Sequence, residues 1–226
     1  MEQAGVARYD ARWGYRTLDA RRYERRRYGG IIRQFNLRLI ERAIGRGLAG
    51  VPPGGVVLDV PCGTGILETS LAARGLRVVG MDISPAMLEV ARERGHALGQ
   101  VRADLELAPC RPQSVDAVVC HRFLMHLPAA SRPRVLQALA RLARGPLVAT
   151  VCHPYTVKSG GRALRRLLGT HPKRSPRLTR TALADEVAAA GLRLERLIPV
   201  LPLLSELWVV VLRTGEQVPA RAREPQ

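Results

Sequence analysis

Residues 56–65 read VVLDVPCGTG, an apolar run that ends in a proline and a glycine-rich turn. The apolar residues 56–60, interrupted only by Asp59, predict a strand that is buried on both faces of a parallel sheet. Pro61 ends this strand, because proline has no backbone N–H to give to a sheet ladder. An apolar helical pattern follows over residues 66–72. A strand, a glycine turn and a helix in this order predict a backbone cradle for a ligand.

An acidic residue at the end of the next predicted strand indicates the kind of ligand. The apolar residues 76–81 predict that second strand, and Asp82 follows it. In nucleotide-binding folds a carboxylate at this position holds the two hydroxyl groups of a ribose. The glycine turn lacks the third glycine of the G-x-G-x-x-G pattern, since Glu68 stands there, and this disfavours a pyrophosphate ligand. An adenosyl ligand without phosphates fits the pattern better.

Four segments in order extend this pattern: VLDVPCGTG at 57–65, VVGMDIS at 78–84, RADLELAP at 102–109 and VDAVVCHRFLMHLP at 115–128. The series resembles the ordered motifs of class I S-adenosylmethionine-dependent methyltransferases over residues 56–150. The resemblance implies an α/β fold with a Rossmann-like seven-stranded sheet, mostly parallel with the last strand antiparallel. Helices are expected on both faces, with an N-terminal helical lid. The implied protein is an enzyme whose cofactor is S-adenosyl-L-methionine.

The resemblance also implies a cofactor site at the strand ends. Asp104 is expected to accept a hydrogen bond from the adenine amino group, and Leu105 to offer its backbone N–H. The turn departs from the D-x-G-x-G-x-G form of many family members, because Pro61 and Cys62 replace its first flexible positions. The expected cofactor-binding residues are Asp59, Pro61, Cys62, Gly63, Thr64, Gly65, Asp82, Ile83, Met87, Asp104, Leu105 and His121.

Three histidines are candidates for removing a proton from a methyl acceptor: His121, His126 and His153. His121 is the first residue past the predicted fourth strand, so it is expected to line the active site. For His126 the alternative role is packing, because apolar residues surround it. His153 follows the predicted fifth strand, and capping of a loop is its alternative role. Methyl transfer by positioning alone, with no general base, is a further alternative.

The length of 226 residues and the hydrophobic share of 46% fit one α/β domain with flanking segments. We expect an N-terminal helical extension or lid at residues 1–50, a methyltransferase domain at 51–213 and a disordered tail at 214–226. Within the domain, residues 153–180 read as an insertion on the acceptor side. The last helix is expected to begin after a cap at Thr181, and Gly45 and Gly47 suggest a frayed or capped helix end. Aromatic residues of these segments are candidates for the acceptor pocket, namely Tyr9, Tyr15, Tyr28 and Tyr155.

The net charge of +17, from 36 Lys and Arg against 19 Asp and Glu, suggests an anionic partner such as RNA or an acidic lipid surface. The alternative is that arginine-rich segments are solvated faces that bind nothing. The four cysteines form no C-x-x-C pair, so we expect reduced thiols and no metal site. The alternative is a metal held by two Cys-His pairs, Cys120-His121 and Cys152-His153, each at the end of a predicted strand. No apolar run approaches the roughly 18 residues of a membrane span, so we expect a cytoplasmic protein without a transmembrane segment. Oligomeric state is not indicated.

The function expected from these features is methyl transfer to a small molecule, such as a metabolite, a natural-product intermediate or a lipid-like quinone. One alternative is an RNA or protein methyltransferase that uses the arginine-rich flanks. The predicted fourth strand is followed by His121-Arg-Phe and not by a D/N-P-P-Y/F tetrapeptide. This difference disfavours methylation of base or glutamine nitrogens. A second alternative is a non-catalytic cofactor-binding partner subunit. An NAD-dependent oxidoreductase is disfavoured by the glycine turn.

Overall fold

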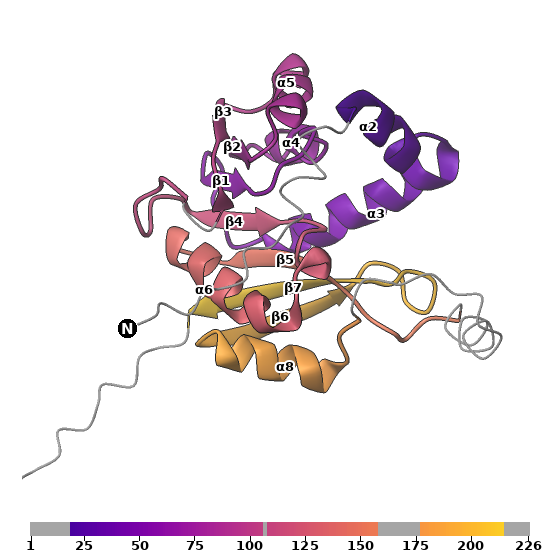
Figure 1. Ribbon diagram of the computed structural model, residues 1–226, viewed down its shortest axis with the longest axis vertical. Helices are drawn as coiled ribbons and strands as arrows, with labels where there is room; N and C mark the ends of the chain where they lie inside the picture. The colour runs from indigo at the N-terminus through magenta and orange to yellow at the C-terminus, as the bar shows by residue number, and fades with distance from the viewer. Residues whose placement is uncertain (1–18, 106–107, 158–176, 215–226) are drawn as a thin grey trace, which may run out of the picture.

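A seven-stranded sheet with the strand order β3-β2-β1-β4-β5-β7-β6 forms the centre of the computed structural model, which describes residues 19–105, 108–157 and 177–214 (Figure 1). Strands β1 to β5 run parallel, and β7 is antiparallel to both of its neighbours, β5 and β6. The predicted fold class, a mostly parallel sheet with the last strand antiparallel, is confirmed. The strands span Val56–Asp59 (β1), Arg77–Asp82 (β2), Gly99–Arg102 (β3), Ala117–Cys120 (β4), Leu147–Cys152 (β5), Leu192–Pro199 (β6) and Leu207–Thr214 (β7).

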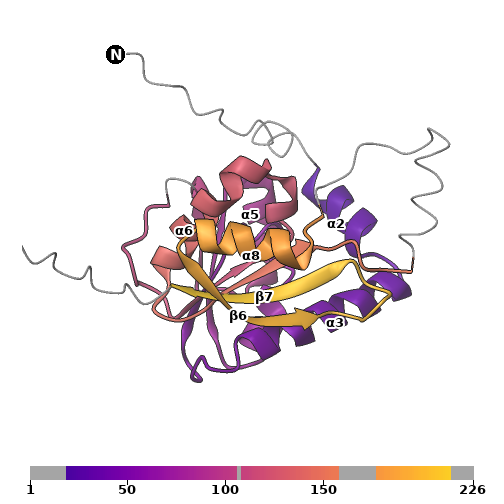
Figure 2. The same ribbon diagram turned by 90° about the horizontal axis from the view of Figure 1, so that it is seen from below.

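Helices cover both faces of the sheet, which explains why its central strands are apolar throughout and do not alternate. On one face, α6 (Arg132–Leu142) and α8 (Arg180–Ala189) pack residues such as Leu139 and Leu183 into the core. On the other face, α3 (Ile31–Gly47) and α4 (Glu68–Ala72) contribute residues such as Ile44 and Leu71. Figure 2 shows α6 and α8 on the side of β7 and β6 opposite to α3.

Helix α5 (Pro85–Arg94) follows β2 and packs on β2 and β3. At its start the Ser84 side chain accepts a hydrogen bond from the Met87 N–H, and Pro85 occupies the first turn. At its end Gly95 adopts a left-handed conformation with φ of 68°. Two short 3₁₀ segments, η2 (Leu124–His126) and η3 (Ala129–Ser131), connect β4 to α6.

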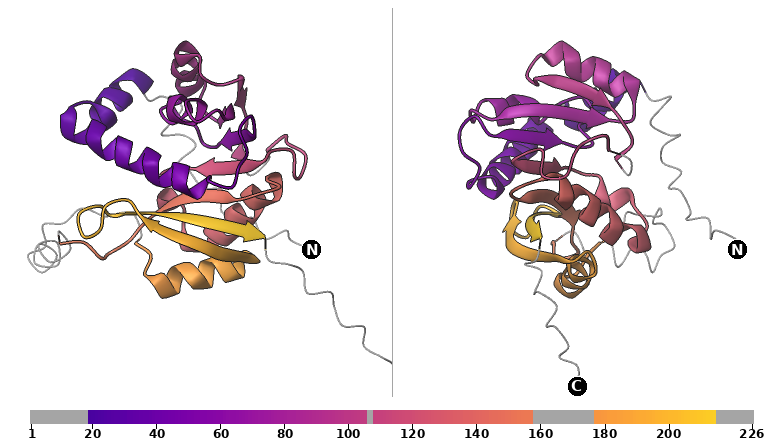
Figure 3. Two further views of the ribbon diagram at one scale, coloured as in Figure 1. Left: turned by 180° about the vertical axis from the view of Figure 1, so that it is seen from behind. Right: turned by 90° about the vertical axis from the view of Figure 1, so that its left-hand side faces the viewer.

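The N-terminal helices α2 (Ala20–Tyr28) and α3 meet at Gly29-Gly30. Figure 3 shows α2 beside α5 and α3 running along the sheet. The glycines of α3 do not mark a frayed end. Gly45 and Gly47 are buried, and a Cβ atom at Gly47 would lie 3.0 Å from a Val148 methyl carbon of β5. Gly47 therefore lets α3 approach the sheet closely, and Gly45 makes room for the Arg74 side chain.

Three other expectations about elements need correction or fall outside the described residues. The helix after the glycine turn begins at Glu68, because residues 63–67 form consecutive turns. Helix α8 begins two residues earlier than expected: Thr179, not Thr181, caps it by accepting the Ala182 N–H at 3.1 Å. The central part of the expected insertion, residues 158–176, and the tail after 214 lie outside the described residues. In the part of the chain that is described, no helix is long and apolar enough to cross a membrane.

Candidate functional site

The carboxyl ends of β1, β2, β3 and β4 surround one cavity. In open parallel sheets this edge is the expected ligand site, at the point where the strand order reverses between β1 and β4. All of the predicted cofactor-binding residues except Gly65 line the cavity. The described residues that line it are Tyr23, Tyr28, Asp59, Val60, Pro61, Cys62, Gly63, Thr64, Ile66, Leu67, Met81, Asp82, Ile83, Met87, Ala103, Asp104, Leu105, His121, Arg122, Phe123, His126 and Leu127.

The glycine turn is held in place by its own backbone and by β2. The Cys62 N–H donates to the Met81 carbonyl at 2.8 Å, and the Gly65 N–H donates to the Cys62 carbonyl at 3.0 Å. Gly63 and Gly65 have φ of 56° and 70°, a region in which a Cβ atom is strained. At Gly65 a Cβ atom would also lie 2.7 Å from Glu68 Oε2, so Gly65 supports the turn from behind the cavity wall.

Asp82 links this turn to the end of β2. Its Oδ2 accepts the Gly63 N–H at 2.9 Å, and its Oδ1 accepts the Ser84 N–H at 2.9 Å. Burial raises the pKa of Asp82, and these backbone hydrogen bonds oppose the rise. A carboxylate has about four acceptor sites, so Asp82 retains acceptor capacity toward the cavity.

The third glycine of the dinucleotide pattern is replaced by a buried polar cluster. Glu68 is fully buried, and its carboxylate accepts two hydrogen bonds from the Gln100 amide nitrogen, at 2.8 and 3.0 Å. Burial raises the pKa of Glu68, against the lowering effect of the Gln100 hydrogen bond. Gly80 of β2 makes room, because a Cβ atom there would lie 2.0 Å from Gln100 Oε1. Glu68 thus underlies the turn and does not line the cavity.

Asp59, at the end of β1, carries a buried carboxylate whose Oδ1 has no hydrogen-bond partner among the described residues. Burial, followed by the nearby carboxyls of Glu68 and Asp82, raises the pKa of Asp59 well above its ordinary value. An unpaired carboxylate in a ligand-sized cavity is suited to a cationic or hydrogen-bond-donating group of a ligand.

The segment after β4 presents a different chemistry to the same cavity. His121, Arg122 and His126 line it together with Phe123. Burial, and then the charge of Arg27, lower the pKa of His121 to about 3, and the same two causes lower the pKa of His126. Both histidines are therefore neutral near pH 7. The sequence signal for His121, its place directly after β4, applies equally to Arg122, which the sequence reasoning overlooked.

Helix α2 covers part of the cavity. Tyr23 and Tyr28 line it, so Tyr28 of the predicted acceptor residues is at the cavity and Tyr23 is an addition. Ion pairs join Arg21 to Glu93 and Glu24 to Arg94, which connects α2 to α5. Arg94 also donates from Nε to the Thr64 carbonyl of the glycine turn at 2.8 Å. Tyr9 and Tyr15 lie outside the described residues.

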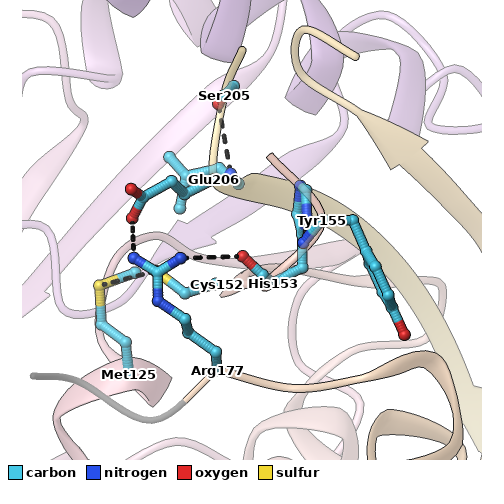
Figure 4. A network of polar contacts seen from close by, with 8 residues as sticks. Met125, Cys152, His153, Tyr155, Arg177, Ser205 and Glu206 are labelled. Carbon is cyan, nitrogen blue, oxygen red and sulfur yellow. Dashed lines mark hydrogen bonds and ion pairs between the residues drawn. The ribbon is translucent and has the colours of Figure 1, made fainter. Parts of the chain in front are cut away.

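His153 and Tyr155 are not among the residues of the cavity, and the structure gives them a different setting (Figure 4). His153 is buried, and its ring stacks on Trp208 of β7 with centroids 4.3 Å apart. Its Nδ1 accepts the Tyr155 N–H at 3.1 Å, so it caps the loop after β5. Tyr155 lies against the same indole, with centroids 5.5 Å apart. An ion pair between Arg177 and Glu206 closes this cluster.

The two Cys-His pairs do not meet in a metal site. Within residues 19–105, 108–157 and 177–214, no three His, Cys, Asp or Glu side chains are grouped so that they could hold a metal ion. Burial raises the pKa of the Cys120 thiol, which lies fully inside the core. Cys152 instead contacts the Met125 sulfur at 3.8 Å.

Comparison with known proteins adds sequence and fold relationships. Residues 57–145 match the family described as a methyltransferase domain. The chain is 43% identical over 97 residues to a ubiquinone biosynthesis O-methyltransferase of Hahella chejuensis, covering 41% of this chain and 40% of the relative. It is 33% identical over 108 residues to a malonyl-(acyl-carrier protein) O-methyltransferase of Serratia marcescens, covering 46% of this chain and 42% of the relative. The chain thus spans less than half the length of these curated relatives.

Among solved structures, the fold is similar to that of a magnesium protoporphyrin IX methyltransferase from Synechocystis with bound S-adenosylhomocysteine (SAH). The TM-score is 0.70 at 21% sequence identity, and the alignment covers 91% of this chain and 98% of that chain. At this identity the likeness concerns the fold alone.

Proposed function

We propose that the class I methyltransferase domain at residues 57–145 binds S-adenosylmethionine in the cavity at the ends of β1 to β4 and methylates a small-molecule acceptor. The observation that carries the proposal is the convergence of the glycine turn, the Asp82 carboxylate and the unpaired Asp59 Oδ1 on one cavity. The named O-methyltransferase relatives support a small-molecule acceptor.

The residues present fit the parts of this cofactor. Asp82 is proposed to accept hydrogen bonds from the two ribose hydroxyls, and Asp104 and Leu105 to face the adenine. The unpaired Asp59 carboxylate suits an ammonium group such as that of the methionine part. When bound, the cofactor supplies a methyl group that is already activated by its positively charged sulfur. The protein's own task is then to orient the acceptor and exclude water, which can lower a barrier by about 7–11 kcal/mol.

We propose that α2 and the first half of α3 act as the lid of this site, with the methyltransferase domain at 51–213. Support comes from Tyr23 and Tyr28, which line the cavity, and from the ion pair of Glu24 with Arg94, which ties α2 to α5. The acceptor-side role of residues 153–180 stays a prediction.

The experiment that tests the proposal is calorimetric titration of the purified chain with SAH, 5′-methylthioadenosine and NAD. We expect SAH to bind in the micromolar range and NAD to bind much more weakly, because no third glycine admits a pyrophosphate. Labelled S-adenosylmethionine with a panel of phenols, carboxylic acids and amines would then identify the acceptor class. Absence of SAH binding at millimolar concentration would refute the proposal, and binding without turnover would favour a partner subunit.

Binding of an anionic macromolecule by the basic flanks stays a separate prediction. Arginines 22, 25 and 26 of α2 are exposed, which suits such contacts but equally suits a solvated face. Binding of bulk RNA that weakens steeply with salt would favour it. A cytoplasmic location likewise stays a prediction.

A further inference from the structure

The turn after β4 is organised by one side chain from the neighbouring strand. Thr150 of β5 is 1% exposed, and its Oγ1 accepts the Arg122 N–H at 2.7 Å. The same Oγ1 lies 3.2 Å from His121 Nδ1. Arg122 has a φ of 55°, a left-handed conformation that costs a residue other than glycine about 1–2 kcal/mol. Thr150 thus holds His121 and Arg122 in a strained turn at the cavity.

This turn presents two nitrogen atoms that no described residue satisfies. His121 Nε2 and Arg122 Nε are both buried, and neither has a hydrogen-bond partner among the described residues. Both side chains line the cavity. Buried polar atoms of proteins are nearly always paired, so each unpaired one needs an explanation. Two unpaired nitrogens on successive residues that line a cavity indicate that a ligand supplies the missing acceptor.

The hydrogen bonds of Thr150 also favour one of the two tautomers of the neutral His121 ring. Because Oγ1 already accepts from the Arg122 N–H, its hydroxyl proton is available to His121 Nδ1. That assignment, made from the hydrogen-bond network, leaves the ring proton on Nε2, which then donates into the cavity. Since burial lowers the pKa of His121 to about 3, the ring is a poor base but remains a donor near neutral pH.

The cavity is therefore divided by charge. Carboxylates stand at the ends of β1, β2 and β3, where the proposed function places the cofactor: Asp59, Asp82 and Asp104. The turn after β4 bears the Arg122 guanidinium and the His121 donor, and the charge of Arg27 on α2 acts on the same region. An anionic group would be repelled on the first side and attracted on the second.

We propose that His121 and Arg122 form an oxyanion site that holds an ionised oxygen of the methyl acceptor, a carboxylate or a phenolate, with Thr150 as the positioning residue. This rests on the proposed function and names its substrate class. The acceptor oxygen, already ionised when it binds, forms a bond to the methyl carbon, and the carbon–sulfur bond breaks with its electron pair moving to sulfur. The products are a neutral methyl ester or ether and a neutral thioether, so no base has to accept a proton.

One other carboxylate could occupy these donors, the methionine carboxylate of the cofactor itself. Two nucleosides, SAH and 5′-methylthioadenosine, distinguish the cofactor carboxylate from the acceptor oxygen, because 5′-methylthioadenosine lacks the amino-acid part that SAH carries. If Arg122 served the cofactor, Arg122→Gln would weaken SAH binding and leave 5′-methylthioadenosine binding unchanged. If Arg122 serves the acceptor, Arg122→Gln leaves the affinity for both nucleosides unchanged.

The test titrates the SAH-loaded protein with benzoate as the anionic probe and benzamide as its neutral isostere. We expect benzoate to bind about tenfold or more tightly than benzamide, the size of effect that charge-assisted hydrogen bonds usually give. Arg122→Gln and Arg122→Gly should both abolish this preference. Glycine relieves the positive φ, so Arg122→Gly should keep or raise the melting temperature and show that the loss is not unfolding. Arg193→Gln, an exposed arginine on β6, is the matched control and should keep the preference.

The positioning role of Thr150 has its own readout. Thr150→Val keeps the shape and removes the hydroxyl, so benzoate affinity should fall and the nitrogen-15 resonances of His121 should report a change of tautomer. Thr150→Ser, which keeps the hydroxyl, should retain both the benzoate affinity and the His121 tautomer of the wild type. Equal binding of benzoate and benzamide, an unchanged preference in Arg122→Gln, or a loss confined to SAH would overturn the oxyanion site while leaving the methyltransferase proposal intact. Failure of SAH to bind would overturn both.

Discussion

Replacement of Asp59 by asparagine should stabilise the ligand-free protein while weakening cofactor binding. Asp59 is 1% exposed, its Oδ1 has no partner among the described residues, and the carboxyls of Glu68 and Asp82 lie close enough to raise its pKa. Such a charge opposes folding, because burial removes its hydration without a compensating partner. Asparagine has nearly the same shape and no charge, so the fold keeps its packing and loses the repulsion.

The size of the effect follows from the burial. An unsatisfied buried polar group costs about 1–3 kcal/mol, and asparagine retains part of that cost, so we expect a gain of about 1–2 kcal/mol. For a protein of this length, that corresponds to a rise in melting temperature of roughly 2–8 °C. SAH at a hundred times its dissociation constant should stabilise the wild type by about 2.7 kcal/mol. A tenfold to hundredfold weaker variant would gain only about 0.4–1.4 kcal/mol at that concentration.

The melting temperatures with and without SAH form the assay. Asp59→Asn should melt higher than wild type without ligand, and SAH at a hundred times the wild-type dissociation constant should reduce this advantage by about 1.3–2.3 kcal/mol. Asp185→Asn, at an exposed site on α8, should change neither. A lower melting temperature of ligand-free Asp59→Asn, or undiminished SAH affinity, would refute the reasoning.

The pH dependence has a defined sign. A carboxyl whose pKa is raised in the folded state holds more protons when the protein is folded. Its contribution to the free energy of unfolding therefore falls as the pH rises from the pKa of the unfolded state, about 3.9, through the pKa of the folded state. The stability advantage of Asp59→Asn should therefore be largest at neutral pH and shrink as the pH is lowered. Unfolding by urea at several pH values would measure it, and an advantage that grew toward acid pH would contradict the assigned cause.

Three further changes test other contacts. Asp82→Ala should weaken SAH binding about tenfold to a hundredfold in calorimetry, because charged hydrogen bonds to two hydroxyls are lost. The exposed control Asp185→Ala should bind SAH as the wild type does, and full affinity of Asp82→Ala would contradict the ribose assignment. Arg94→Gln removes the ion pair with Glu24, so amide hydrogen exchange in α2 should accelerate and SAH should dissociate a few-fold faster. Unchanged amide exchange in α2 would show that this ion pair does not hold the lid. His153→Ala should lower the free energy of unfolding by about 1–3 kcal/mol, because the ring stack and the loop cap are lost, and should leave the SAH affinity unchanged. A loss of SAH binding would show that His153 contributes to the binding site.

The sheet and the proposed cofactor side of the cavity were predictable because each depends on local sequence. The apolar runs of β1, β4 and β5 contain few polar residues, since both faces of those strands are covered. The glycine turn and Asp82 directly adjoin their strands, so knowing the strand ends is enough to place them. Gly63, which must adopt a positive φ, carries its conformational signal in its residue type.

The acceptor side depends on contacts between distant segments, which no local pattern reveals. His121 and His153 each follow a cysteine at the end of a strand, and the sequence does not separate them. The difference is the neighbouring strand: β4 lies beside β1 at the cavity, whereas β5 lies beside β7, where Trp208 stacks on His153. Arg122 was overlooked for the same reason, because its conformation is set by Thr150 on another strand.

The buried pair of Glu68 and Gln100 restricts how this binding site can be redesigned. A glycine in place of Glu68 alone would leave the Gln100 amide without its acceptor and open a void behind the turn, so the single change should destabilise the protein. Conversion to a dinucleotide-type loop therefore requires Glu68 and Gln100 to be exchanged together, with energetic effects that do not add. In this protein the two loop types are thus separated by at least two coupled substitutions, and a stepwise mutational path between them should pass through a less stable intermediate.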